Sequence, residues 1–108
     1  GYRPLSFVGA YSATKAALIQ ITKSQSIELA KYNICVNALA PGYILTDINR
    51  KQLEGDAGVL IKKKIPLKRF ATVEELDVII SMLVNPHNTY MTGASIAVDG
   101  GLSTGLWQ

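Results

Sequence analysis

The sequence has little cysteine and no long hydrophobic run, although it is rich in apolar residues. Its one cysteine, Cys35, excludes a small fold held together by disulfides. The most apolar stretch, residues 78–84, is about a third of the roughly 20 residues that a membrane-spanning helix needs, so we expect no membrane partner. No charged segment followed by an apolar one opens the chain, and we expect a cytoplasmic protein. Disorder is also excluded, because hydrophobic residues make up 48% of the 108 residues and can form a core.

Acidic residues are fewer than basic ones, and the excess of positive charge is local. The chain has 8 Asp and Glu against 11 Lys and Arg, which gives a net charge of +3. The basic residues crowd into one short stretch, at Lys62, Lys63, Lys64, Lys68 and Arg69. The ordinary interpretation is a solvated helix end and loop, and attraction of a phosphorylated ligand is a second one. The stretch lacks the interleaved aromatics and the motif of a nucleic-acid binder, so we expect no nucleic-acid partner.

Histidine is scarce as well. His87 is the one histidine, and no cluster of cysteine, histidine or acidic residues surrounds it in the sequence. No metal site is therefore predicted.

Helix-forming and helix-breaking residues divide the chain into helices and strands. Residues 1–10 are expected to form a loop, because Pro4 and Gly9 interrupt regular structure. The pattern then predicts a helix over 12–30 ended by Asn33, a strand over 34–39, one or two short helices within 46–64, a helix between 72 and 86, and a strand over 94–98. Thr72 and Glu75 have the spacing of a capping box.

The order of these elements sets the fold class. Two strands joined by a helical crossover are parallel, so the chain is α/β. A parallel sheet needs more strands and helices on both faces, so two strands are too few. We therefore expect the chain to be a piece of a larger sheet or to take strands from other chains. Cys35 falls within the first strand, where a buried thiol behaves as a small hydrophobe.

A tyrosine and a lysine at the start of the first predicted helix are the sharpest candidates for chemistry. Tyr11 and Lys15 are four residues apart, which puts them on one helix face, one turn apart. An ammonium close to a phenol lowers the tyrosine pKa from about 10, so such a tyrosine can act as general acid or base near neutral pH. About 0.4 such spacings arise by chance in this composition, so the spacing alone does not exclude a helix-start tyrosine beside an exposed lysine.

The residues around and after this pair form an ordered series. Tyr-Ser-Ala-Thr-Lys at 11–15 is followed by Asn37, Pro41-Gly42 and Thr46, and then by Asp99-Gly100-Gly101. The series resembles the C-terminal part of the short-chain dehydrogenases/reductases, which carry Tyr-x-x-x-Lys, a strand ending in Asn-x-(x)-x-Pro-Gly with a Thr four residues past the Gly, and a terminal Asp/Asn-Gly-Gly. The resemblance covers residues 9–101 and implies a Rossmann-like, doubly wound parallel sheet with helices on both faces. It implies that residues 1–108 are the C-terminal portion of one NAD(P)-binding domain, without its N-terminal βα units.

The resemblance assigns a role to each matching position. It implies that Tyr11 is the catalytic acid/base, which gives a proton to a carbonyl oxygen as hydride arrives at the carbon, or removes it in the reverse direction. Lys15 is then the residue that assists Tyr11, and both contact the cofactor at the nicotinamide ribose. The nicotinamide of NAD or NADP would be held at four positions near the end of the first strand: Pro41, Gly42, Ile44 and Thr46.

The segment from 46 to 64 matches the variable lid over the substrate. Gly55 and Gly58 are expected hinges for such a lid. Tyr43 is expected either to line the pocket or to be an ordinary half-buried aromatic. Asp99 is expected to organise the Asp-Gly-Gly turn through its side chain.

The implied activity is NAD(P)-dependent interconversion of an alcohol and a carbonyl in a small-molecule substrate, by hydride transfer. Members of the family are usually dimers or tetramers, so a homodimer or homotetramer is expected. The catalytic serine and the Gly-rich phosphate turn of the family are not in these residues, so the chain alone is expected to be inactive. The alternative is a non-catalytic scaffold or assembly module derived from the same fold.

Overall fold

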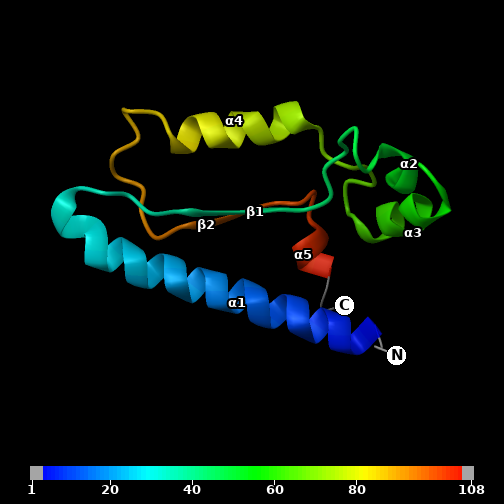
Figure 1. Ribbon diagram of the computed structural model, residues 1–108, viewed down its shortest axis with the longest axis horizontal. Coiled ribbons are helices and arrows are strands. Elements are labelled where there is room, and N and C mark those ends of the chain that lie inside the picture. The colour runs from blue at the N-terminus through cyan, green and yellow to red at the C-terminus, as the bar shows by residue number, and fades with distance from the viewer. Residues whose placement is uncertain (1–3, 106–108) are drawn as a thin grey trace. The chain divides into compact units, whose positions relative to one another are not determined.

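The computed structural model describes residues 4–105, with side chains from Ala13 to Thr104 (Figure 1). Its elements follow in the order α1 Pro4–Leu29, η1 Ala30–Tyr32, β1 Ala38–Pro41, α2 Arg50–Leu53, α3 Asp56–Lys64, α4 Val73–Leu83, β2 Ser95–Val98 and α5 Leu102–Gly105. The chain forms two compact units. The first contains the chain up to Ala38 together with His87–Ile96, and the second contains Leu39–Pro86 together with the chain from Ala97 onward.

Helix α1 begins at Pro4, so the loop predicted for residues 1–10 is wrong from position 4 onward. Proline fits the first turn of a helix, where its missing N–H would have no partner within the helix. Gly9 costs a helix interior only about 1 kcal/mol relative to alanine, which a helix of 26 residues tolerates. The helix passes into η1 and ends at Asn33, whose left-handed backbone with φ 59° confirms the predicted terminator.

Two buried hydroxyls show how α1 packs within the first unit. Thr22 and Ser26 are buried, and each hydroxyl donates to a carbonyl of the same helix at 2.7 Å, so neither is left unsatisfied. Gly93 lies against Ser26, because a Cβ on this glycine would come within 2.9 Å of the Ser26 Oγ. Gly93 also has a φ of 77°, which confirms the turn predicted at Thr92-Gly93.

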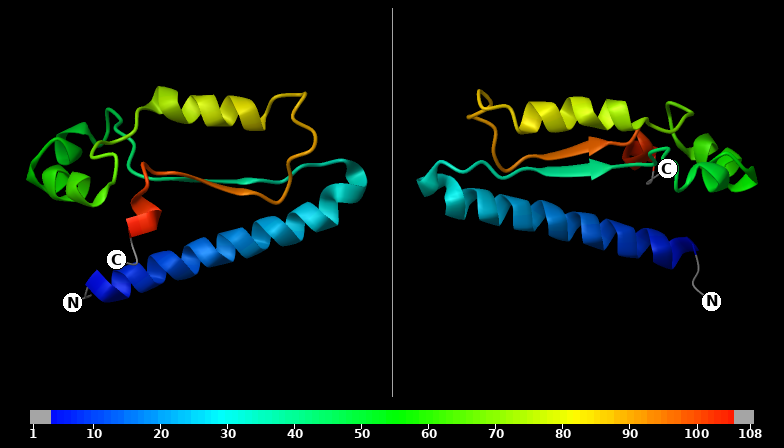
Figure 2. Two further views of the ribbon diagram at one scale, coloured as in Figure 1. Left: turned by 180° about the vertical axis from the view of Figure 1, so that it is seen from behind. Right: turned by 45° about the horizontal axis from the view of Figure 1, so that its top comes forward.

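The two strands form a parallel pair. The Ala38 N–H donates to the Ala94 carbonyl at 2.8 Å, and the Gly42 N–H donates to the Val98 carbonyl at 2.9 Å. Both strands therefore advance together along the ladder, and their arrows point in the same direction in Figure 2. The predicted parallel pairing is confirmed.

The first strand lies later in the chain than predicted, at Ala38–Pro41 in place of 34–39. The reason is that the residues before it are bonded to the turn that precedes β2. The Val36 N–H donates to the Thr92 hydroxyl at 3.0 Å. The Asn37 amide donates to the Met91 carbonyl and accepts from the Ala94 N–H, both at 3.0 Å. Together with one backbone bond, from the Gly93 N–H to the Val36 carbonyl at 2.7 Å, these side-chain bonds replace a regular ladder before Ala38.

Cys35 belongs to this irregular stretch and is exposed, so the prediction of a buried thiol within a strand is wrong. Its Sγ lies 3.8 Å from the Thr89 carbonyl oxygen, a weak contact. The second strand, Ser95–Val98, agrees with its prediction to within one residue.

The core of the second unit gathers where α2, α3 and the loop after α3 meet (Figure 1). Leu53, Ile65 and Phe70 are buried, and Ile65 is only 2% exposed. Partly buried hydrophobic side chains pack against them: Leu45, Ile61 and Leu102. Helices α2 and α3 confirm the prediction of short helices within 46–64.

Gly58 has a packing role within this core. It is buried in α3, and a Cβ at this position would overlap the carbonyl of Leu53 at the end of α2. The glycine therefore permits a close backbone approach, and the predicted hinge at Gly58 is wrong. Gly55, the residue before α3, remains the predicted hinge.

The start of α4 confirms the predicted capping box. The Thr72 hydroxyl accepts from the Glu75 N–H at 3.2 Å, and the Glu75 carboxylate accepts from the Thr72 N–H at 3.0 Å. These two bonds satisfy N–H groups that a helix start leaves without partners. The helix ends at Leu83, before Pro86.

Candidate functional site

Tyr11 and Lys15 both lie on α1, so the helical spacing behind their predicted pairing is present. The Lys15 side chain is half-buried. The Tyr11 side chain lies outside the described residues. Both residues belong to the first unit, and the contact between phenol and ammonium stays a prediction.

The Pro41-Gly42 turn lies in the second unit, at the carboxyl end of β1. A Cβ on Gly42 would come within 2.7 Å of the Asp99 Cβ and 2.8 Å of its Cα. Asp99 is held in turn, because its carboxylate accepts from the Gly101 and Ser103 N–H groups at 3.0 and 3.1 Å. The predicted role of Asp99 in this turn is confirmed. Glycine at position 42 lets the ends of the two strands lie close together.

The backbone of Ile44, just beyond Gly42, includes a donor without a partner among the described residues. Ile44 forms a parallel bridge with Ala71, in which the Leu45 N–H donates to the Ala71 carbonyl at 2.9 Å and the Ala71 N–H donates to the Tyr43 carbonyl at 3.0 Å. The N–H and the carbonyl of Ile44 itself therefore face away from Ala71. The carbonyl accepts from the Asn49 Nδ2 at 2.8 Å. The N–H makes no hydrogen bond among residues 4–105.

Thr46 and Asn49 bond one another in both directions. The Thr46 N–H donates to the Asn49 Oδ1 at 2.7 Å, and the Asn49 N–H donates to the Thr46 hydroxyl at 3.4 Å. The hydroxyl oxygen is therefore an acceptor, and its proton has no acceptor within the described part of the chain. The Ile44 N–H and the Thr46 O–H are thus two available donors on one short, half-buried segment. Such a pair can bind a carboxamide or another carbonyl group.

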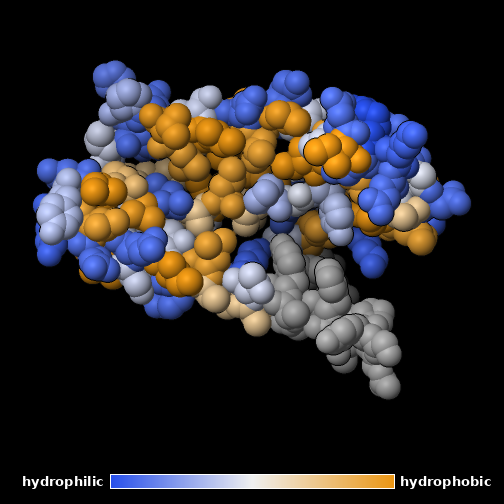
Figure 3. Space-filling view, in the orientation of Figure 1, coloured by the Kyte–Doolittle hydropathy of each residue, from blue (hydrophilic) through white to orange (hydrophobic). Residues whose placement is uncertain are grey.

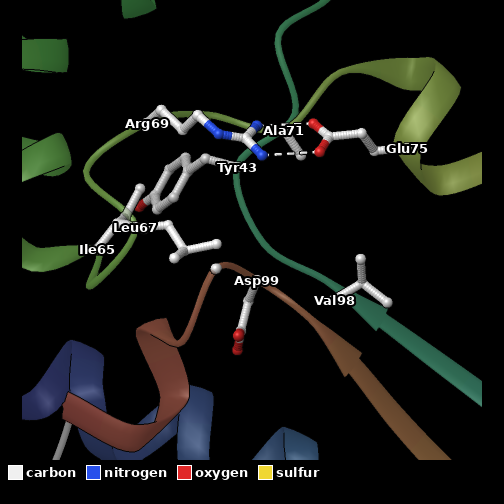
Figure 4. Close-up of a pocket in the computed structure, with 9 residues that line it drawn as sticks. Tyr43, Ile65, Leu67, Arg69, Ala71, Glu75, Val98 and Asp99 are labelled. Carbon is white, nitrogen blue, oxygen red and sulfur yellow. Dashed lines mark hydrogen bonds and ion pairs between the residues drawn. The ribbon is translucent and has the colours of Figure 1, made fainter.

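A cavity of about 120 Å³ lies in the second unit (Figure 4). Its wall is mostly apolar and contains Tyr43, Ile65, Leu67, Arg69, Ala71, Glu75, Val98, Asp99 and Gly100. In Figure 4 the Arg69 and Glu75 side chains point toward one another, and the Asp99 carboxylate points toward the α5 side. Tyr43 lines this cavity and packs its ring 6.2 Å from that of Phe70. Its place in a substrate pocket stays a prediction.

Sequence similarity extends over nearly the whole chain. Residues 2–103 match the protein-family model described as enoyl-(acyl carrier protein) reductase. The chain belongs to the short-chain dehydrogenase/reductase family. The resemblance drawn from the Tyr-x-x-x-Lys, Pro-Gly and Asp-Gly-Gly motifs is thereby confirmed for the family.

Two solved structures and one curated sequence illustrate the similarity to this family. The 3-oxoacyl-[acyl-carrier-protein] reductase of Thermotoga maritima is 44% identical over 92 residues, which are 85% of this chain and 37% of that protein. A short-chain dehydrogenase/reductase from Serratia marcescens superposes with a TM-score of 0.76 at 32% identity, over 86% of this chain and 37% of that one. A 4-hydroxyisoleucine dehydrogenase complexed with NADH gives a TM-score of 0.76 at 30% identity, over 90% of this chain and 40% of that one. The predicted α/β fold with a partial parallel sheet is therefore confirmed, and the chain spans a little over a third of the length of such relatives.

An ion pair between Arg69 and Glu75 closes the loop between α3 and α4 in this member of the family. The two guanidinium nitrogens donate to the two carboxylate oxygens at 2.7 and 2.8 Å. The hydrogen bond from Arg69, followed by that from the Thr72 N–H, lowers the pKa of Glu75 to about 2. The same pair raises the pKa of Arg69.

This ion pair predicts an acid-sensitive start of α4. Because the pKa of Glu75 is lowered from 4.5 to about 2, its contribution to stability is complete above pH 4.5 and is lost as the pH falls toward 2. We expect Glu75→Gln to flatten the pH dependence of unfolding in this window, measured by urea midpoints between pH 2 and 7. Glu74→Gln is the control, because Glu74 has no ion pair among the described residues. A Glu75→Gln profile parallel to that of the unsubstituted protein would contradict the expectation.

The basic stretch after α3 is partly used within the chain. The Lys62 Nζ lies 5.2 Å from the centre of the Phe70 ring, and the Lys68 Nζ donates to the Lys63 carbonyl at 2.6 Å. Arg69 is paired with Glu75. These contacts favour the ordinary interpretation of a solvated helix end, which cations stabilise at a C-terminus. Attraction of a phosphorylated ligand stays a prediction.

Asn49 is a functional candidate that the residue pattern alone does not predict. It follows Thr46 by three residues, and this spacing of a threonine and a hydrogen-bonding side chain is typical of a reciprocal cap or turn. The capping box at Thr72 was found from the same signal, because a helical pattern follows it at once. Helix α2 has only four residues, so no such pattern points to Asn49.

Among the described residues, no group of three or more His, Cys, Asp or Glu side chains could hold a metal ion. Within residues 4–105, no helix is both long and apolar enough to cross a membrane.

Proposed function

We propose that the protein is an NAD(P)-dependent oxidoreductase that interconverts an alcohol and a carbonyl by hydride transfer. The observation that carries this proposal is the pair of available donors at the carboxyl end of β1, the Ile44 N–H and the Thr46 hydroxyl. Ligands of open α/β sheets bind beyond the carboxyl ends of the strands. Membership of the short-chain dehydrogenase/reductase family supports the same conclusion.

The residues near this strand end fit a nicotinamide. The Ile44 N–H and the Thr46 O–H can donate to the carboxamide oxygen, and Gly42 keeps the adjacent strand ends free of a side chain. Pro41 and Gly42 would place this segment against the ring, and Tyr11 and Lys15 would contact the nicotinamide ribose. The cofactor, when bound, supplies or accepts the hydride. NADH in the related 4-hydroxyisoleucine dehydrogenase supports this class of cofactor, and the choice between NAD and NADP stays open.

Tyr11 and Lys15 would handle the proton. The Tyr11 phenol gives its proton to the carbonyl oxygen of the substrate, or its phenolate removes the hydroxyl proton in the reverse direction. The Lys15 ammonium stabilises the phenolate that remains after proton transfer. Their positions one turn apart on α1 support this division of roles.

The substrate class is a small alcohol or carbonyl compound. The relative from Thermotoga maritima is named as a 3-oxoacyl-[acyl-carrier-protein] reductase, and another relative as a D-arabinitol 2-dehydrogenase, so both acyl and sugar-like compounds belong in a substrate panel. The segment with α2 and α3 would form the lid over the substrate, with Gly55 as its hinge.

Assembly into a homodimer or homotetramer is part of this proposal. Hydrophobic side chains gather over α4 in Figure 3. Among the residues of this helix, Val78 and Met82 are exposed. Helix α1 also exposes large apolar side chains, including Ile21 and Ile27. Apolar surface of this kind is typical of a protein interface, or of a face covered by further strands. We propose a cytoplasmic protein without nucleic-acid or membrane partners.

We further propose that this chain is the C-terminal portion of one Rossmann-type domain. The full-length protein should then oxidise NADH or NADPH in the presence of a carbonyl panel, followed at 340 nm. The 108 residues alone should show no turnover, because a serine and a phosphate-binding turn are required from upstream. Turnover by the isolated chain would contradict this expectation. Absence of turnover by the full-length protein would favour the alternative, a non-catalytic scaffold or assembly module.

A further inference from the structure

Asn49 occupies the position before α2 where an asparagine commonly caps its own helix. Its side chain makes no such cap bond. Instead the amide turns back along the chain and bonds two residues of the preceding segment, Ile44 and Thr46. The side chain of Asn49 therefore does not serve the start of α2 but the segment before it.

Both polar atoms of the Asn49 side-chain amide form hydrogen bonds with this segment. The Nδ2 donates to the Ile44 carbonyl at 2.8 Å, and the Oδ1 accepts from the Thr46 N–H at 2.7 Å. The backbone N–H of Asn49 adds a third bond, to the Thr46 hydroxyl at 3.4 Å. Three bonds from one residue therefore fix the backbone between Ile44 and Thr46.

These bonds also determine which groups of the segment remain available. The Ile44 carbonyl accepts a hydrogen bond from Asn49, and the other edge of the backbone at this position is bridged to Ala71. The Ile44 N–H is therefore the group of this residue that can bind a ligand. With the Thr46 hydroxyl oxygen accepting from Asn49, the hydroxyl proton is directed elsewhere. We propose that Asn49 is a positioning residue that holds these two donors in place for the nicotinamide carboxamide. This inference rests on the proposed function.

The first test measures the segment without any cofactor. In the full-length protein, Asn49→Ala should raise amide hydrogen exchange at Thr46 by about tenfold or more, because its N–H loses its acceptor. Gln52→Ala is the matched control, since Gln52 carries a similar amide on α2 and makes no side-chain hydrogen bond among the described residues. Unchanged exchange at Thr46 in Asn49→Ala would overturn the positioning role.

The second test separates the nicotinamide from the rest of the cofactor. Affinity for NADH or NADPH should fall about tenfold in Asn49→Ala, whereas affinity for ADP-ribose or its 2′-phosphate, which lack the nicotinamide, should stay within twofold. Asn49→Asp keeps the acceptor for the Thr46 N–H but loses the donor to Ile44, so its dinucleotide affinity should lie between those of Asn49→Ala and the unsubstituted protein. Titration calorimetry gives all these values without turnover.

The outcomes distinguish this inference from the function on which it rests. A parallel loss of affinity for both kinds of ligand, or no loss for either, would overturn the role of Asn49. An unsubstituted protein that binds NADH and NADPH no more tightly than the corresponding ADP-ribose would contradict the nicotinamide contact, and with it the proposed function. In that case the exchange measurement still decides whether Asn49 fixes the segment.

Discussion

Replacing Tyr11 with phenylalanine in the full-length protein is expected to lower kcat/KM for carbonyl reduction by about 10²- to 10⁴-fold, the usual contribution of a general acid. The substitution removes the phenolic oxygen and leaves the ring. Hydride transfer to the carbonyl carbon then leaves the developing alkoxide without its proton donor. Affinity for NADH or NADPH should change far less, because Tyr11 is only one of the six proposed cofactor contacts. Steady-state kinetics and dinucleotide titration on the same preparation give both values.

Tyr32→Phe is the matched control for this substitution. Tyr32 lies in η1, is 63% exposed, and carries the same phenol, so its removal should leave kcat/KM unchanged. Activity of Tyr11→Phe near that of Tyr32→Phe would refute the proton-transfer role. A loss of cofactor affinity as large as the loss of kcat/KM would point to a structural role for Tyr11 instead.

Gly58→Ala is expected to destabilise the segment with α2 and α3 by about 3 kcal/mol, at the upper end of the usual cost of overpacking. The added methyl would overlap the Leu53 carbonyl, which is backbone and cannot rotate away. The two helices must therefore separate, and Leu53 would leave a core that it shares with Ile65 and Phe70. Urea unfolding of the full-length protein measures the loss, and amide exchange over residues 50–64 localises it.

Gly55→Ala provides a control three residues away. A Cβ there would meet its nearest atom, the Lys51 carbonyl oxygen, at 3.4 Å, which is an ordinary contact. Gly55 also has φ −87° and ψ −164°, which alanine adopts without strain. The substitution should be neutral or stabilise by up to about 1 kcal/mol, through a less flexible unfolded chain. Equal effects of the two substitutions would contradict the packing role of Gly58.

Local features of the fold followed from the sequence. The capping box of Thr72 and Glu75, the terminator Asn33 and the turn at Asp99 depend on groups within a few residues of one another. Their residue types and spacings carry most of the information, because a short stretch of chain offers few other partners. The parallel pairing followed as well, since a helical crossover between two strands permits little else.

The sequence-based predictions were wrong at three places, of which one depends on a partner far along the chain. The first strand begins at Ala38, because Asn37 is bonded to the Ala94 N–H, 57 residues away in the sequence. Helix α1 extends back to Pro4, because proline is compatible with a first turn and does not by itself predict a loop. Gly58 was expected to be a hinge, and only the position of Leu53 shows that it is a point of close contact.

In the candidate site, too, some features follow from the sequence and others depend on the fold. The sequence by itself determined the family and the Tyr11–Lys15 spacing on a helix, because residue type and order carry motifs. It also predicts cofactor positions at Pro41, Gly42, Ile44 and Thr46, and these stay a prediction. Only the tertiary structure decided which donors of that segment are free. The bridge to Ala71 turns the Ile44 N–H and carbonyl to the other side of the backbone, and Asn49 occupies that carbonyl together with the Thr46 N–H. A group that already makes a hydrogen bond is not available to a ligand in the same way.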